Sequence, residues 1–225
     1  EAGRRVAAFG YWAGYAGAAV ALKCWLVQKS GGIAGPIRAV EDAGKLRTAL
    51  RDDLGEARPT VIVIGALGRV GTGAADLCGE MGLPVTKWDM AETAHGGPFP
   101  EVLDHDIFLN CIFAWPGTPA FVPADAGARA WRLSVIGDIA CDPTSDFSPI
   151  KVYDRPTDWN APALRVHDNP PLDVTAIDNL PSLLPRESSE DYAAQLLPSL
   201  LALDDLGAGV WGRAKAEFDR HIATL

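Results

Sequence analysis

The sequence predicts an α/β fold built on a mostly parallel, doubly wound sheet. Short apolar runs rich in β-branched residues alternate with stretches of helical periodicity, which is the order of βαβ units. The runs carry little polar alternation, as is typical of parallel strands that are covered on both faces. The four runs lie at residues 61–64, 84–89, 107–113 and 133–140.

The first element is a helix that begins in a charge-free run, residues 6–22, preceded by Arg4 and Arg5. That arrangement imitates a secretory signal. However, the glycines and alanines of the run recur at helical spacing and form a small-residue face. Lys23 ends the run short of the ~20 apolar residues that a membrane span needs. We therefore expect a closely packed helix and no targeting or membrane segment.

A loop at residues 31–36 precedes an amphipathic helix that we expect at 37–54. Pro59 opens the first strand, and a helix at 72–81 ends before Gly82. A shorter run at 150–153 is expected at the periphery of the sheet.

After residue 177 the apolar runs end, and two prolines, Pro181 and Pro185, interrupt the chain before two stretches of helical periodicity. Ser188 or Ser189 can cap a helix that runs towards Leu200, and residues 209–225 predict another. Both helices carry apolar stripes that require a partner. We divide the chain into a sheet domain, 1–184, and C-terminal helices, 185–225.

Composition excludes several classes of function. The 20 basic and 29 acidic residues give a formal charge of −9, and no basic run is present, so a nucleic-acid partner is not expected. Neither the four cysteines nor the four histidines have the spacing of metal ligands. We expect no metal, and buried free thiols in a cytoplasmic protein.

The most informative motif is the glycine series Gly65, Gly68 and Gly71 that follows the first strand. Such glycines allow backbone amides to approach a pyrophosphate at the N-terminus of a helix. Asp89 then ends the second strand, near the offset expected for an acid that binds a ribose. This pattern predicts a Rossmann-like domain that binds NAD rather than NADP. The alternative is a glycine-rich turn that binds no ligand.

Several segments together resemble the NAD-dependent, lysine-forming saccharopine dehydrogenases. They span nearly the whole chain in the family's order, at residues 3–10, 65–71, 87–93, 96–99, 110–112, 177–187 and 218–221. The resemblance implies an architecture like that of alanine dehydrogenase, with two domains. It also implies that an N-terminal substrate domain lies upstream of Glu1 and covers the C-terminal helices.

The implied reaction is the oxidative deamination of saccharopine to lysine and 2-oxoglutarate. The catalytic lysine and histidine would lie upstream of Glu1, so no catalytic residue is assigned here. NAD is expected at Arg4, Gly68, Arg69, Asp89, Thr93, Phe113, Ile139, Ile177, Asp178, Asn179 and Leu180. Substrate is expected at Arg5, Phe9, Ala140, Cys141 and Asp142.

Alternatives remain at two of these residues and for the function. Arg5 could bind a substrate carboxylate or could be a solvated arginine. Asp142 could pair with a substrate ammonium or cap the turn that follows it. The chain could also be a non-catalytic NAD-sensing module, or a dehydrogenase for another secondary amine of the opine type.

Overall fold

The computed structural model describes residues 5–126 and 131–223. This part of the chain forms two compact units. The larger comprises residues 10–185, and the smaller combines residues 5–9 with 186–223. The predicted division after residue 184 lies beside this boundary, whereas residues 5–9 group with the C-terminal helices.

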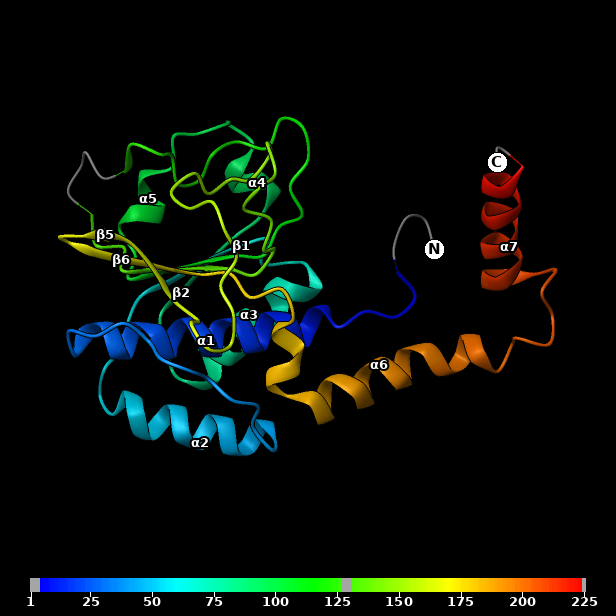
Figure 1. Cartoon of the computed structure of the whole chain (residues 1–225), viewed down its shortest axis with the longest axis horizontal. Helices are drawn as coiled ribbons and strands as arrows, with labels where there is room; N and C mark the ends of the chain where they lie inside the picture. Colours follow the sequence, from blue (N-terminus) through cyan, green and yellow to red (C-terminus); the bar gives the residue numbers. More distant parts are fainter. Residues whose placement is uncertain (1–4, 127–130, 224–225) are drawn as a thin grey trace. The chain divides into compact units, whose positions relative to one another are not determined.

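The larger unit is built on one six-stranded sheet, which Figure 1 shows between layers of helices and connections. The strand order is β2-β1-β3-β4-β6-β5. The first five strands in this order are parallel, and β5 pairs antiparallel with β6. The predicted mostly parallel sheet is therefore confirmed. The bounds are β1 Val61–Ile64, β2 Val85–Trp88, β3 Ile107–Asn110, β4 Val135–Asp138, β5 Leu164–Asp168 and β6 Pro171–Thr175.

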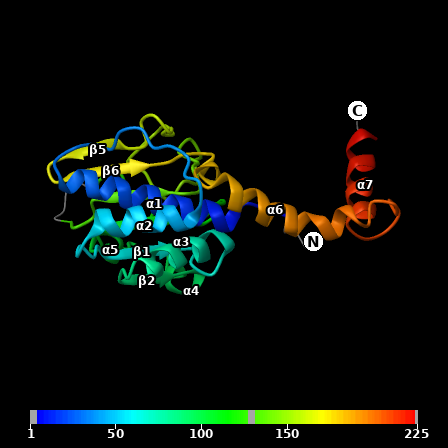
Figure 2. The same cartoon turned by 90° about the horizontal axis from the view of Figure 1, so that it is seen from below.

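One face of the sheet is covered by α1 (Gly10–Lys29) and α3 (Arg69–Glu80), and α2 (Ala43–Leu54) packs outside α1 (Figure 2). Helices α1 and α3 approach closely because glycines face each other. A Cβ on Gly14 would lie 1.8 Å from the Val70 carbonyl oxygen, and one on Gly73 would lie 1.9 Å from that of Tyr11. The predicted small-residue face is thus confirmed. No helix in residues 5–126 or 131–223 is long and apolar enough to cross a membrane.

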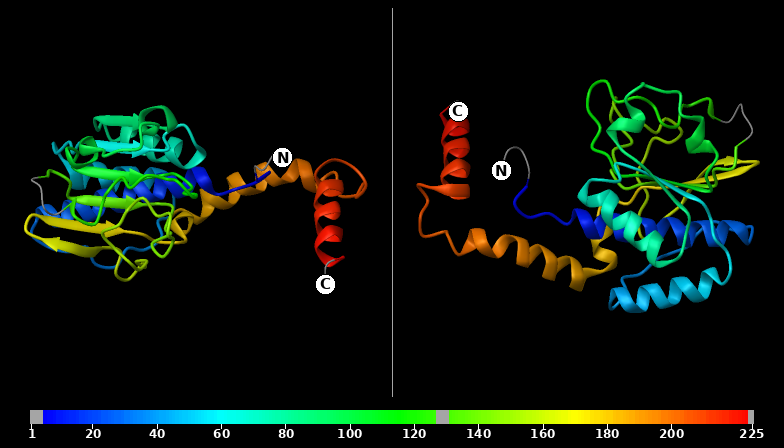
Figure 3. Two further views of the ribbon diagram at one scale, coloured as in Figure 1. Left: turned by 90° about the horizontal axis from the view of Figure 1, so that it is seen from above. Right: turned by 180° about the vertical axis from the view of Figure 1, so that it is seen from behind.

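The opposite face of the sheet is covered by two short helices and long connections (Figure 3). The helices are α4 (Met90–Thr93) and α5 (Pro100–Leu103). Aromatic side chains from these connections, including Phe99, Phe121 and Tyr153, pack on strand residues such as Phe108. Both faces are therefore apolar, and this explains the uninterrupted burial of β1, β3 and β4.

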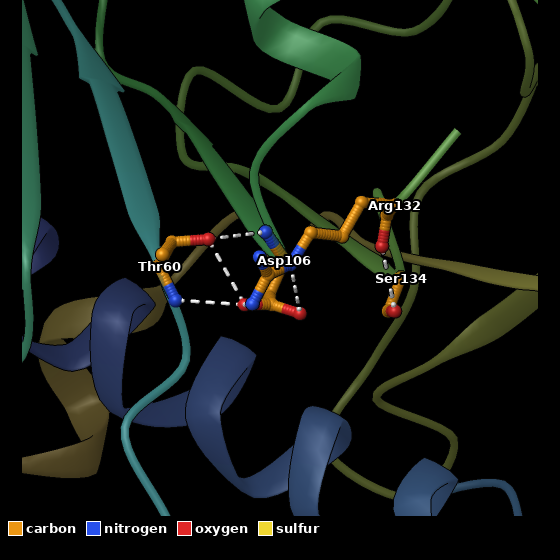
Figure 4. A network of polar contacts seen from close by, with 4 residues as sticks. All are labelled: Thr60, Asp106, Arg132 and Ser134. Atoms are coloured by element: carbon orange, nitrogen blue, oxygen red, sulfur yellow. Dashed lines mark hydrogen bonds and ion pairs between the residues drawn. The ribbon is translucent and has the colours of Figure 1, made fainter. Parts of the chain in front are cut away.

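A polar network joins the beginnings of three strands (Figure 4). The Asp106 carboxylate accepts hydrogen bonds from the Thr60 amide at 2.8 Å and from the Arg132 guanidinium at 3.0 and 2.8 Å. The Ser134 amide donates to the Asp106 carbonyl oxygen. Burial acts to raise the pKa of Asp106, but the bonds from Arg132 and Thr60 outweigh it, and the pKa is lowered. The network fixes β1, β3 and β4 at their N-terminal edge.

Several predicted helix bounds were wrong. The helix expected at 72–81 spans Arg69–Glu80. The helix expected from residue 37 begins at Ala43, where the Asp42 side chain caps it through the Lys45 amide. Residues 37 and 40 instead donate backbone hydrogen bonds to Trp159 and Leu183, so tertiary contacts keep this segment extended. The first helix begins at Gly10 and continues past Lys23 to Lys29.

The β5–β6 hairpin was not predicted. The shorter run at 150–153 forms an isolated bridge between Ile150 and Val122 rather than a strand of the sheet. A 3-10 helix, η2 (Leu180–Leu183), follows β6.

The smaller unit contains α6 (Pro185–Leu200) and α7 (Gly209–Ile222). Helix α6 begins at Pro185, so the predicted cap at Ser188 or Ser189 was wrong. Phe9 stacks on Tyr192 with ring centroids 4.4 Å apart, and the Ala8 amide donates to Gln195 Oε1 at 3.1 Å. Much of the predicted apolar stripe is exposed, at Leu197, Leu200, Phe218 and Ile222.

Candidate functional site

The C-terminal ends of the five parallel strands meet at one edge of the sheet and carry most of the predicted site residues. Because the chain passes from β1 to β2 and then returns to β3 on the other side of β1, the direction of winding reverses between β1 and β3. Ligands of open α/β sheets bind in the crevice at such a reversal. The segments at this edge are 65–71 after β1, 89–93 after β2, 111–113 after β3, 139–142 after β4 and 176–180 after β6.

Gly65 allows the loop after β1 to pass close to the segment after β3. Its φ of +87° lies in the left-handed region that favours glycine. An added Cβ would lie 2.9 Å from the carbonyl carbon and oxygen of Cys111. A Cβ on Gly71 would lie 2.1 Å from the Gly65 carbonyl oxygen, so α3 packs directly on the loop. The fold itself requires these two glycines.

Gly68 differs because the fold does not require it. Its φ is −76°, and an added Cβ would meet only the Gly65 carbonyl oxygen, at 3.4 Å, which is an ordinary contact. Gly68 is exposed and forms the N-cap of α3 without a side-chain capping bond. The uncapped positive end of a helix beside a bare backbone suits a pyrophosphate, so this part of the site fits a dinucleotide.

Asp89 has two structural roles besides the one predicted for it. Its Oδ2 accepts a hydrogen bond from the Leu67 amide at 2.9 Å, and its Oδ1 accepts one from the Met90 amide at 2.9 Å. It also forms a capping box with Glu92, which accepts from the Asp89 amide at 2.7 Å. The carboxylate is therefore fixed beside the glycine loop. A carboxylate held there can accept further bonds from ribose hydroxyls.

Three other predicted residues lie on the same edge. The Thr93 hydroxyl donates to the Asp89 carbonyl oxygen at 3.0 Å, one helical turn along α4. Arg69 is exposed as the first residue of α3. The Phe113 side chain, which follows β3, is 83% exposed and so has a free aromatic face.

Asp138 organises the turn after β4. The residue is buried, with 2% of its surface exposed. The carboxylate accepts hydrogen bonds from Tyr153 Oη at 2.5 Å, from Asn110 Nδ2 at 2.9 Å and from the Cys141 amide at 3.3 Å. Burial raises the pKa of Asp138 above its ordinary value, although these bonds oppose the rise. Cys141 itself has a φ of +51°, an uncommon conformation for a side chain with a Cβ.

The predicted substrate residues of this turn differ in exposure. Ala140 and Asp142 are exposed, and Cys141 is half-buried, with its thiol donating to the Ala176 carbonyl oxygen at 3.2 Å. Burial raises the pKa of the Cys141 thiol to about 11. The following turn is closed by the Ser145 amide, which donates to the Asp142 backbone oxygen. Asp142 thus closes the turn with its main chain, and its side chain faces solvent.

The segment after β6 offers two kinds of group. Ile177 and Leu180 are buried in the apolar core, at 2% and 3% exposure, so only their backbones can meet a ligand. Asp178 and Asn179 are exposed, and Asn179 Oδ1 accepts from Trp159 Nε1 at 2.8 Å.

Ile139 lies between the turn after β4 and the first helix. Its half-buried side chain fills the notch at Gly17 of α1, where an added Cβ would lie 2.6 Å from Ile139 Cγ1. A ligand over the sheet edge can therefore meet only the remaining part of this side chain.

Three predicted residues do not belong to the larger unit as described: Arg4, Arg5 and Phe9. Arg4 lies outside the described residues. Arg5 and Phe9 are exposed and belong to the smaller unit, whereas Ala140, Cys141 and Asp142 belong to the larger one. The structure therefore brings together the predicted cofactor residues from Gly68 to Leu180 and leaves the predicted substrate residues in two units.

Sequence reasoning missed the buried residues behind this edge, Asn110, Asp138 and Tyr153. A weak signal was available, since Asn110 and Asp138 each interrupt a predicted apolar run with a polar side chain. Tyr153 carried no such signal, because its contact with Asp138 depends on the path of the connection between them.

No family model matches the chain. Curated relatives do match over nearly its whole length, and each is named saccharopine dehydrogenase (NAD+, L-lysine-forming). The relative from Yarrowia lipolytica is 45% identical over 99% of the chain. Those from Neurospora crassa and Candida albicans are 45% and 41% identical over 100% of the chain.

The chain spans about 65% of the length of the curated relatives that it matches. Proteins that share 41–45% identity over this length have the same fold, and the Rossmann-like sheet is the fold observed here. The chain therefore belongs to the saccharopine dehydrogenase family.

Proposed function

We propose that this chain is the NAD-binding portion of a saccharopine dehydrogenase. The observation that carries the proposal is the fixed pair of Gly68 and Asp89 at the reversal of the sheet. Gly68 offers bare backbone at a helix N-terminus, and Asp89 is held beside it through the Leu67 amide. This pair supplies the two requirements of an NAD site, a place for the pyrophosphate and an acid for the ribose.

We assign the two ends of NAD to different parts of the edge, with the strand order as support. The adenosine ribose lies at Asp89 and Thr93 beyond β2, and the pyrophosphate lies at Gly68 and Arg69. The nicotinamide end then lies beyond β3, β4 and β6, because a dinucleotide extends across both halves of such a sheet. Its neighbours there are Phe113, Ile139 and the Ile177–Leu180 segment, and Arg4 completes the proposed set.

The proposed reaction converts saccharopine, NAD and water into lysine, 2-oxoglutarate and NADH. NAD accepts the hydride when it is bound. We assign substrate contacts to Arg5, which would bind a carboxylate, and Phe9 in the smaller unit, and to the Ala140–Asp142 turn in the larger unit. Deprotonation of the amine and activation of water require an acid and a base. We assign these to a lysine and a histidine of a preceding substrate domain.

The same proposal accounts for the apolar side chains of α6 and α7, which we assign to contacts with that substrate domain. It also places the protein in the cytoplasm, consistent with four free cysteines.

Titration of the 225-residue chain with NADH and with NADPH, followed by fluorescence, tests the proposal. We expect NADH to bind at least tenfold more tightly, because Asp89 would repel the additional phosphate. Equal affinities would contradict the cofactor assignment. Full turnover of lysine, 2-oxoglutarate and NADH by this chain alone would contradict the assignment of the acid and base to another domain.

A further inference from the structure

The buried cluster of Asn110, Asp138 and Tyr153 lies directly behind the nicotinamide half of the proposed site. Asn110 ends β3 and Asp138 ends β4, and these two residues are paired in the register of the two strands. Tyr153 comes from the connection on the far face and reaches the same carboxylate. All three residues are buried, at 0%, 2% and 7% exposure.

This cluster makes the folded state less stable than apolar residues at the same positions would. A buried carboxylate loses its hydration, and burial raises the pKa of Asp138 accordingly. Asn110 Oδ1 is buried and has no hydrogen-bond partner among the described residues. Leucine or valine at these strand ends would avoid both costs. Polar groups placed at such a cost are typical of positions where function constrains the geometry.

The geometry of the cluster shows what it holds. The carboxylate accepts from the Cys141 amide at 3.3 Å, and Cys141 has the positive φ of +51°. Without a bond to its amide, a non-glycine residue would tend to leave this conformation. Asp138 is in turn fixed by two donors, Tyr153 Oη and Asn110 Nδ2. The turn at 139–142 is therefore held from beneath.

We infer that Asp138, oriented by Tyr153 and Asn110, is a positioning residue that pre-forms the turn at 139–142 and so places Ile139, the residue of this turn assigned to the nicotinamide end of the cofactor. The inference rests on the proposed function, which supplies the ligand. It assigns the cluster no contact with that ligand. A pre-formed turn binds more tightly because less ordering is needed when the ligand arrives.

The test compares NADH with ADP-ribose, which lacks the nicotinamide. In Tyr153→Phe one donor to Asp138 is removed without a change of shape. We expect the dissociation constant for NADH to rise about tenfold, and that for ADP-ribose to change less than about twofold. Asn110→Ala removes the other donor and should act in the same direction.

Tyr15→Phe is the matched control. Tyr15 is 1% exposed and donates to Oε2 of the exposed Glu80 at 2.6 Å, so a bond from a buried tyrosine to a carboxylate is again lost. Tyr15 packs in the apolar cluster on the other face of the sheet from Tyr153. We expect this variant to leave the ratio of the two affinities unchanged. A loss of binding through general destabilisation would appear in the control as well.

A second readout needs no ligand. The rate at which a thiol reagent labels Cys141, followed by peptide mass spectrometry, reports whether the turn is held. We expect faster labelling of Cys141 in Tyr153→Phe and no change in Tyr15→Phe.

The outcomes separate the inference from the proposed function. If neither NADH nor ADP-ribose binds the parent chain, the proposed function is wrong and the assigned role fails with it. If both bind but Tyr153→Phe labels at the parental rate, the cluster does not hold the turn. If Cys141 is labelled faster but the ratio of the NADH and ADP-ribose affinities is unchanged, the cluster holds the turn without affecting cofactor binding, and its role is only structural. Either of the last two results overturns the inference while the proposed function stands.

Discussion

The carboxylate of Asp89 accepts a hydrogen bond from the backbone amide of Leu67, at 2.9 Å. This bond joins the end of β2 to the glycine loop that follows β1. The same carboxylate caps α4 through the Met90 amide. Asp89 therefore organises the loop before any ligand arrives, and substitutions there affect both the fold and the site.

Asp89→Asn removes the charge and keeps a residue that can cap α4. Asparagine is as good an N-cap as aspartate, but its single acceptor oxygen can keep only one of the two amide bonds, so we expect the free energy of unfolding to fall by about 1 kcal/mol. Loss of the charge should weaken NADH binding about tenfold and bring the affinities for NADH and NADPH close together. Fluorescence titration and thermal unfolding measure the two quantities. Asp89→Ala should cost about 1 kcal/mol more in stability, because it also removes the cap.

Gly68→Ala tests whether the glycine loop serves a ligand. A Cβ there makes only an ordinary contact, at 3.4 Å from the Gly65 carbonyl oxygen. We expect a change in stability within about 1 kcal/mol and a loss of NADH affinity of about tenfold or more. Gly71→Ala is the contrasting variant, since its Cβ would lie 2.1 Å from the same oxygen and should disrupt the fold. Unchanged NADH binding in Gly68→Ala would argue against a pyrophosphate at this position.

Two glycines of α3 make a direct test of the packing between α1 and α3. Gly73→Ala places a Cβ 1.9 Å from the Tyr11 carbonyl oxygen, and we expect a destabilisation of about 3 kcal/mol or more. Nothing lies within 4 Å of a Cβ on Gly79. Gly79→Ala should therefore stabilise the protein by about 0.5–1 kcal/mol, through helix propensity alone. Urea unfolding of both variants measures the free energy of unfolding, which should fall in Gly73→Ala and rise in Gly79→Ala.

The lowered pKa of Asp106 predicts a loss of stability in acid. A carboxyl group whose pKa is lower in the folded state stabilises the fold fully at pH values above its unfolded pKa of about 3.9. That stabilisation is lost as the pH falls through the lowered folded pKa. Asp106→Asn should destabilise the protein by about 1–3 kcal/mol at pH 7 and make stability less dependent on pH below about 5.

Urea unfolding at a series of pH values measures this effect. Asp104→Asn provides a control at an exposed residue on the same connection. If both variants keep the parental slope in acid, Asp106 does not account for the acid sensitivity.

The sequence was sufficient for the four strands β1 to β4 and for the loop after β1, because the glycine series and the uninterrupted apolar runs are local patterns. It did not reveal the β5–β6 hairpin, since Asp173 interrupts the apolar pattern of β6. That charge is buried at 1% exposure and is paired with Arg165 at 2.5 Å. Gln28 also donates to it, from a position 145 residues away. A buried charge with distant partners cannot be distinguished locally from a loop aspartate.

The same reason limits what could be predicted of the site. Asp89 and Gly68 belong to a local motif with a known offset, and both lie where that motif requires. The support beneath residues 139–142 depends on Asn110, 28 residues from Asp138, and on Tyr153, 15 residues from it. No local pattern reports such bonds.

The pairing of Ala8 with Gln195 joins residues that are 187 positions apart. Ribosomes add roughly 5–20 residues per second, so on the order of ten seconds or more separate the synthesis of these two residues. Residues 10–185 are synthesised within that interval and leave the ribosome before residue 195 does. The sheet can therefore fold during translation while residues 5–9 still await their partners, and the smaller unit is completed last although it contains the earlier residues of the described chain.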